Sequence, residues 1–204
     1  VSTGDLDGRI FGLSPNGEYL IFTRRSNKPA DEEINTLWAV RTRNLDPKLI
    51  SLQASNVVRF AEWIPGTNSV AYSTVEPRSA APGWQANNDL YRVSITGGTP
   101  RKLLSTNSGG VYGWWGMSFA YSPDGKLAYA RPDQIGLVDQ DGGYLKPLLD
   151  ITPLNTHSDW AWIPPLVWGA DGESLYFASH APASAPITSE ESPYFDLTAT
   201  SFSS

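Results

Sequence analysis

The sequence predicts an all-β protein assembled from four copies of one four-stranded unit. Three observations support this fold class: one hairpin segment recurs along the chain, two further strand-like runs follow it, and helical 3.6-residue periodicity is nearly absent. The four hairpin segments share a large apolar residue, a turn and a short apolar or aromatic run: Leu13–Phe22, Trp63–Tyr72, Tyr121–Tyr129 and Trp168–Phe177. Their starts lie 50, 58 and 47 residues apart, which indicates tandem repeats.

The first two strands of each unit are predicted by the chemistry of the turn between them. Pro-Asn-Gly precedes the second strand of the first unit, and Pro-Asp-Gly precedes that of the third. Proline presets φ, Asn or Asp hydrogen-bonds its own backbone, and glycine accepts a positive φ. We therefore expect Gly17, Gly125 and Gly172 to occupy hairpin turns on a common face of the protein.

The next two strands follow at a regular offset. In the first three units they are predicted at Thr36–Thr42 and Lys48–Leu52, at Asn88–Ser94 and Arg101–Leu104, and at Gln134–Asp139 and Lys146–Leu149. Gly-Gly pairs separate the two strands in the second and third units. The fourth unit offers only Tyr194–Thr198 and lacks a convincing last strand.

Four strands in each unit of about 40–50 residues is the period of propeller blades. The predicted fold is therefore a β-propeller with four recognisable four-stranded blades, the last incomplete. We expect a single β-propeller domain or a propeller fragment over 1–204, with blades at about 9–52, 57–104, 115–149 and 163–204. An incomplete blade exposes a sheet edge, so the sequence predicts either the N-terminal part of a larger propeller or self-association through the open blade edge.

The third repeat carries a family resemblance. Tyr121–Tyr129, followed by Ile135–Gly143, resembles the repeat of TolB-like propellers, and the propeller domains of the dipeptidyl-peptidase and prolyl-oligopeptidase families look similar. The resemblance extends from about Phe11 to Phe177 and is loosest in the fourth repeat, where Gly169-Ala170 replaces Ser-Pro. It implies a binding scaffold with an extracytoplasmic (periplasmic, secreted or cell-surface) or peptidase-associated role.

Composition excludes several classes of function. The chain has 15 basic and 21 acidic residues, a net charge of −6, and no long basic stripe, so we expect no nucleic-acid partner. It contains no cysteine, which rules out disulfides, thiolate catalysis and cysteine-based metal sites. No apolar run approaches the ~20 residues that span a bilayer. We expect neither a cofactor nor a metal.

The ligand site is predicted from the loops. If the strands of a blade are lettered a to d from the channel outward, the b–c loops and the d–a connections share one face. The b–c loops are long at about Arg25–Asn35, Glu76–Asn88 and Ser179–Pro193, and the d–a connections are rich in tryptophan. Aromatic loops on one rim of a rigid scaffold are typical binding sites. The predicted ligand-binding residues are Trp84, Trp114, Trp115, His157, Asp159, Trp160 and Trp162, and the ligand class is a protein, a peptide or a carbohydrate.

Each of these residues also has a structural interpretation. The loop tryptophans could fill space between blades, since Trp is highly buried on average. His157 beside Asp159 could bind a metal or act as an acid–base pair, or it could satisfy local hydrogen bonds. The strand residues Trp38, Trp63 and Trp168 are expected in the core.

Two functions from different classes follow. The first is a non-enzymatic binding or protein-interaction scaffold of TolB-like type with its ligand at the loop rim. The alternative is an accessory or gating propeller domain of a serine peptidase or hydrolase whose catalytic domain lies outside this chain, because Gly-x-Ser-x-Gly is absent. A propeller enzyme would require convergent His, Arg and acidic residues, and no catalytic residue is assigned.

Overall fold

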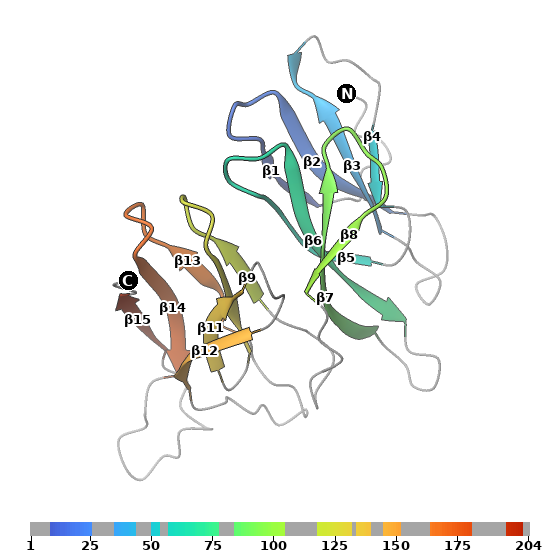
Figure 1. Cartoon of the computed structure of the whole chain (residues 1–204). Helices are drawn as coiled ribbons and strands as arrows, with labels where there is room; N and C mark the ends of the chain where they lie inside the picture. Colours follow the sequence, from blue (N-terminus) through green and yellow to red (C-terminus); the bar gives the residue numbers. More distant parts are fainter. Residues whose placement is uncertain are drawn as a thin grey trace, which may run out of the picture. The chain divides into compact units, whose positions relative to one another are not determined.

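The computed structural model describes residues 9–25, 35–43, 50–53, 57–77, 84–104, 118–131, 134–139, 145–151, 164–180 and 195–201. All regular elements in these ranges are β-strands (Figure 1). The chain divides into two compact units, Val1–Gly109 (unit 1) and Gly110–Ser204 (unit 2). Within the described ranges, no helix is long and apolar enough to span a membrane.

Unit 1 contains the first two blades. Blade 1 consists of β1 (Ile10–Leu13), β2 (Tyr19–Arg25), β3 (Asn35–Arg41) and β4 (Ile50–Gln53). Blade 2 consists of β5 (Val57–Trp63), β6 (Ser69–Pro77), β7 (Trp84–Ser94) and β8 (Arg101–Leu104). Successive strands within each blade pair antiparallel. A parallel bridge between Asn35 and Val57 joins the two blades.

Unit 2 contains the third and fourth blades. Blade 3 consists of β9 (Ser118–Tyr121), β10 (Leu127–Ala130), β11 (Gln134–Val138) and β12 (Leu145–Asp150). Blade 4 has three described strands, β13 (Leu166–Trp168), β14 (Ser174–His180) and β15 (Phe195–Ser201). All pairings are antiparallel. The predicted all-β propeller fold with four blades is confirmed, and three strands of the fourth blade lie in the described residues.

The hairpin turns have the predicted chemistry. Gly17, Gly125 and Gly172 have φ values of 69°, 93° and 67°, a region that L side chains rarely adopt. Each donates its backbone N–H to a carbonyl three residues earlier, at 2.8, 2.9 and 3.0 Å. Within unit 2 the two turns lie side by side, because Lys126 Nζ donates to the carbonyl of Gly172 at 3.0 Å. That contact places Gly125 and Gly172 on one face of this unit.

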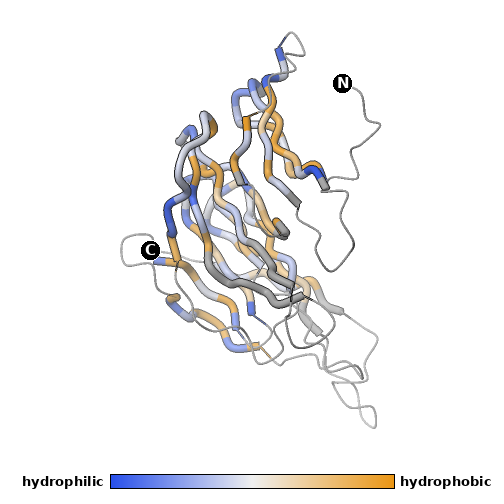
Figure 2. Tube along the Cα trace, turned by 90° about the vertical axis from the view of Figure 1, so that its right-hand side faces the viewer, coloured by the Kyte–Doolittle hydropathy of each residue, from blue (hydrophilic) through white to orange (hydrophobic). Residues whose placement is uncertain are grey.

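The core of each unit lies between its two blades. In unit 1, Ile21, Leu37 and Ala39 of blade 1 pack with Val70 and Tyr72 of blade 2, and burial raises the pKa of the Tyr72 hydroxyl. In unit 2 the cluster comprises Ala120, Ala128, Ala130 and Ile135 of blade 3 with Leu166, Leu175 and Phe177 of blade 4. Figure 2 shows apolar residues concentrated along the strands, as burial between facing sheets requires.

A tryptophan side chain links the blades in each unit. Trp168 donates its Nε1–H to the carbonyl of Ala120 in β9 at 2.9 Å, and Trp63 donates to the carbonyl of Gly12 in β1 at 3.4 Å. Gly12 and Ala120 each precede the first repeat residue of their own blade, so the two bonds are structurally equivalent. Trp63 is buried as predicted, whereas Trp168 is half-buried.

Two sequence-based details differ from the structure. Trp38 was expected in the core, but it is half-buried, and the Arg24 guanidinium stacks on its ring at 5.5 Å. The loop predicted at Glu76–Asn88 is shorter, because β6 runs to Pro77 and β7 begins at Trp84. Pro77 and Trp84 are register partners, so the hairpin arms extend into the predicted loop.

Candidate functional site

Most of the predicted loop site lies outside the described residues. This applies to Trp114, Trp115, His157, Asp159, Trp160 and Trp162. Trp84 is placed by its backbone at the start of β7, and nothing is described of its side chain. The grouping of these seven residues into one site therefore stays a prediction.

The strand pairing of unit 2 does define the end at which two of the long loops begin. Ala130 pairs with Ile135, Gln134 with Asp150, and His180 with Phe195. The ends of β10, β12 and β14 therefore share one end of the unit. Ile151 and His180, the last described residues before positions 152–163 and 181–194, lie at this end, opposite the Gly125 and Gly172 turns.

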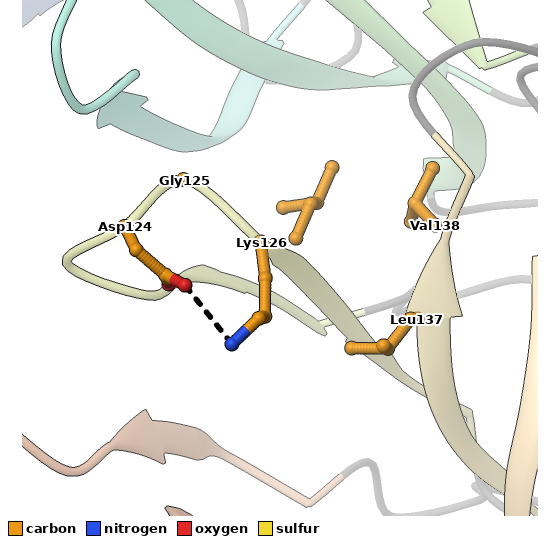
Figure 3. A pocket seen from close by; sticks show the side chains of 6 residues that line it. Asp124, Gly125, Lys126, Leu137 and Val138 are labelled. Carbon is orange, nitrogen blue, oxygen red and sulfur yellow. Dashed lines mark ion pairs between the residues drawn. The ribbon is translucent and has the colours of Figure 1, made fainter. Parts of the chain in front are cut away.

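The opposite end of unit 2 carries a described cluster of polar groups at the turn of blade 3. The Ser122 hydroxyl donates to Asp124 Oδ1 and accepts the backbone N–H of Lys126 at 2.7 Å. Lys126 Nζ forms an ion pair with Asp124 Oδ2 at 2.9 Å (Figure 3). The hydrogen bond from Ser122, followed by that from Lys126, lowers the pKa of the Asp124 carboxyl. Asp124 is therefore ionised at neutral pH.

A shallow cavity of about 330 Å³ adjoins this turn and is lined by Asp124, Gly125, Lys126, Leu127, Leu137 and Val138 (Figure 3). Its volume is at the low end for small-molecule sites. The Lys126 ammonium already binds both the Asp124 carboxylate and the Gly172 carbonyl. The charged groups of the cavity thus hold the two turns together.

The turn of blade 4 uses its carboxylate in the same structural way. Asp171 accepts the backbone N–H groups of Ser174 and Glu173, each at 2.9 Å, and the Ser174 hydroxyl at 2.8 Å. These bonds, that from the Ser174 backbone first, lower the pKa of Asp171. Asn16 accepts the Glu18 N–H at the equivalent turn of blade 1. The polar residues of the turns therefore stabilise hairpins.

The described residues contain no cluster of metal-ligating side chains. Among those residues, no group of three or more His, Cys, Asp or Glu side chains is placed to hold an ion. His180 belongs to β14 by its backbone, and His157 lies outside the described residues.

Comparison with known proteins supports the fold. No protein-family model and no curated protein matches the chain. Among solved structures, a puromycin hydrolase matches with a TM-score of 0.59 and 18% identity, over 95% of this chain and 27% of its own. The tricorn protease matches with a TM-score of 0.52 and 13% identity, over 86% of this chain and 15% of its own. A gluconolactonase from Xanthomonas campestris matches with a TM-score of 0.50 and 12% identity, over 82% and 52%.

These likenesses define the chain as a β-propeller scaffold. At such low identity they show the fold and no more. This chain spans about a quarter of the puromycin hydrolase and about half of the gluconolactonase. The matches agree with the peptidase-propeller part of the resemblance, and they leave the TolB-like part unconfirmed.

Proposed function

We propose that this propeller is a non-catalytic binding scaffold that takes a protein, peptide or carbohydrate ligand on the loops at the b–c and d–a end. The polar groups at the other end of unit 2 support this assignment, because they are already engaged in hydrogen bonds and an ion pair. Asp124, Lys126 and Asp171 are all engaged in holding turns. The predicted loop site is rich in tryptophan, and aromatic side chains exposed at such a site would suit stacking on a ligand.

Tryptophan substitutions test the proposal. Trp114→Ala and Trp160→Ala should weaken binding at least tenfold to the hits from a mixed-sequence peptide array or an oligosaccharide array. Their melting temperatures should stay within about 2 °C of the parent, because an exposed side chain contributes little to folding. Trp38→Phe, in the described strand β3 and outside the predicted site, is the control and should bind normally. Unfolding of both alanine variants would establish a packing role and contradict the site.

A second candidate is an accessory or gating propeller domain of a serine peptidase or hydrolase. It is favoured by the match of 95% of this chain to 27% of a puromycin hydrolase. The chain has no Gly-x-Ser-x-Gly nucleophile turn, so the catalytic serine would belong to another domain. We place either form outside the cytoplasm, in line with the TolB-like resemblance, and cell fractionation tests this.

The encoding gene distinguishes the two candidates. A nucleophile turn encoded after Ser204 would favour the accessory domain, and further propeller repeats would favour the scaffold. Residues 1–204 alone should not hydrolyse aminoacyl- or prolyl-coumarin substrates. Hydrolysis by the purified chain at a rate that survives repeated purification would contradict both candidates.

A further inference from the structure

The hairpin turns of blades 1, 3 and 4 differ in the group that precedes their glycine. Asp124 and Asp171 have lowered pKa values and are carboxylates at neutral pH, whereas Asn16 is an uncharged amide. Asn16-Gly17 is the one Asn-Gly pair in the sequence, and both residues are exposed. An amide carbon can be attacked by a nucleophile with loss of ammonia, while an ionised carboxylate resists attack. Of these three turns, that of blade 1 is therefore the reactive one.

The nucleophile in this turn is the backbone nitrogen of Gly17. A side chain after Asn hinders attack by its own nitrogen on the Asn Cγ, and glycine has no side chain. The surroundings are open as well, because a Cβ built on Gly17 would meet no atom within 4 Å. The Gly17 N–H donates to the carbonyl of Ser14 at 2.8 Å. This bond must open and the nitrogen must lose its proton before attack, so the reaction should accelerate with rising pH.

The turn also holds two hydrogen-bond donors on the oxygen that would carry the charge. Asn16 Oδ1 accepts the Ser14 hydroxyl at 2.6 Å and the backbone N–H of Glu18 at 3.1 Å. Attack at Cγ moves negative charge onto this oxygen, and donors fixed at a developing charge stabilise the transition state. The donors are themselves held, because the Ser14 hydroxyl accepts the N–H of Tyr19 at 3.0 Å and the Glu18 carbonyl accepts the N–H of Thr42 at 2.9 Å.

We propose that Asn16 is a self-modifying site, which the turn of blade 1 converts to aspartate by deamidation through Gly17. The Gly17 nitrogen loses its proton and bonds to Asn16 Cγ, and the Cγ–Nδ2 bond breaks as ammonia leaves with a proton. Water then adds to Cγ of the cyclic imide, the bond from Cγ to the Gly17 nitrogen breaks, and that nitrogen regains a proton. One water is consumed and one ammonia is released, with no change of oxidation state.

The same donors select the product. Water that adds to Cγ of the imide gives aspartate, whereas water that adds to the main-chain carbonyl carbon gives isoaspartate, in which the chain runs through the side chain. The bonds from Ser14 and Glu18 polarise the Cγ carbonyl, so opening at Cγ is favoured. The new carboxylate keeps an oxygen for these donors, as Asp171 does for the N–H of Glu173. Because it is ionised it resists a second attack, so the modification stops at aspartate.

Incubation of the folded chain in mildly alkaline buffer tests the proposal. Peptide mapping by mass spectrometry should locate the first deamidation at Asn16, at a rate that rises with pH. Aspartate should exceed isoaspartate roughly threefold or more in the folded chain, whereas a synthetic peptide of residues 10–24, which lacks the fixed donors, should form mainly isoaspartate. Asn16→Asp is the reference for the charge and chromatographic position of the product. A folded chain that stays unmodified at Asn16, or that gives the product ratio of the peptide, would overturn the proposal.

Ser14→Ala separates the action of the donors from simple mobility of the turn. The variant loses one donor to Asn16 Oδ1 and the bond accepted from Tyr19, so its turn is less restrained. We expect deamidation roughly tenfold slower or more, with a larger share of isoaspartate. Ser122→Ala, at the equivalent serine of blade 3, is the matched control and should leave the rate at Asn16 unchanged. Faster deamidation in a Ser14→Ala chain that circular dichroism shows to be folded would mean that mobility governs the reaction, and would overturn the role of the donors.

Discussion

The hydrogen bond from Trp168 to blade 3 permits a direct test of how the blades are joined. Replacing Trp168 with β-(3-benzothienyl)alanine keeps the size of the ring and exchanges its N–H for sulfur. The carbonyl of Ala120 then loses a partner at 2.9 Å, within the normal N–H···O range. A lost hydrogen bond costs about 1 kcal/mol, and more where the acceptor is buried, so we expect about 1–2 kcal/mol of destabilisation. For a chain of this length that corresponds to roughly 2–8 °C in melting temperature.

The equivalent residue of the other unit is the matched control. Trp63 reaches the Gly12 carbonyl at 3.4 Å, beyond the usual range, so the same replacement there should cost less than about 0.5 kcal/mol. Trp63 is nevertheless the more buried of the two rings. An account based on packing alone therefore predicts the opposite order, or no difference, because the replacement preserves ring size.

Urea denaturation followed by far-ultraviolet circular dichroism measures both effects, since tryptophan fluorescence would change with the substitution itself. The midpoint should fall for the Trp168 replacement at constant m-value. Equal shifts at both positions, or a larger shift at Trp63, would refute the assignment of stability to the hydrogen bond. A changed m-value would show that the two units no longer unfold as in the parent.

Three further predictions concern the fold. Gly136→Ala would place a Cβ in a clash with the backbone oxygen of Lys146, so we expect a loss of about 3 kcal/mol or more. Gly125→Ala should cost only about 1 kcal/mol by urea titration, because φ is 93° there but the added Cβ would meet no neighbouring atom within 4 Å. Asp171→Asn should reduce the loss of stability between pH 7 and pH 3. The pKa of Asp171 is lowered in the folded state, so its carboxylate stabilises the fold above the unfolded-state pKa, and this contribution is lost as the pH falls through the folded-state pKa. Leu175→Ala should cost about 2–5 kcal/mol, since the side chain is fully buried between the blades of unit 2; a calorimetric shift below 1 °C would contradict that placement.

The local structure of the repeat could be predicted because its determinants are close in sequence. The turn glycines, the Asn or Asp before them and the apolar run after them act within about ten residues. Gly17 and Gly125 accordingly have positive φ, and Asn16 and Asp124 accept local hydrogen bonds as the turn chemistry requires. These local signals are sufficient to predict the hairpins and the number of blades.

The contacts between blades could not be predicted in this way. The partners of Trp63 and Trp168 lie 51 and 48 residues away, and both tryptophans were expected simply in the core. Their shared position at the start of a repeat was the available signal. The loop site was predicted from the clustering of tryptophan in the connections. Those connections lie largely outside the described residues, so the predicted site still rests on the clustering of tryptophan in the sequence.

Two strands at the same place in the repeat of unit 2, β10 and β14, differ in burial. A strand covered on both faces is apolar at successive positions rather than at alternate ones. All four residues of β10 are buried, and three of them are Leu127, Ala128 and Ala130. In β14, at the same place in the repeat, Leu175 is fully buried and its neighbour Tyr176 is 39% exposed, although both are large and apolar in character. The sequence of β14 is therefore apolar at successive positions, as in a strand covered on both faces, although Tyr176 is exposed.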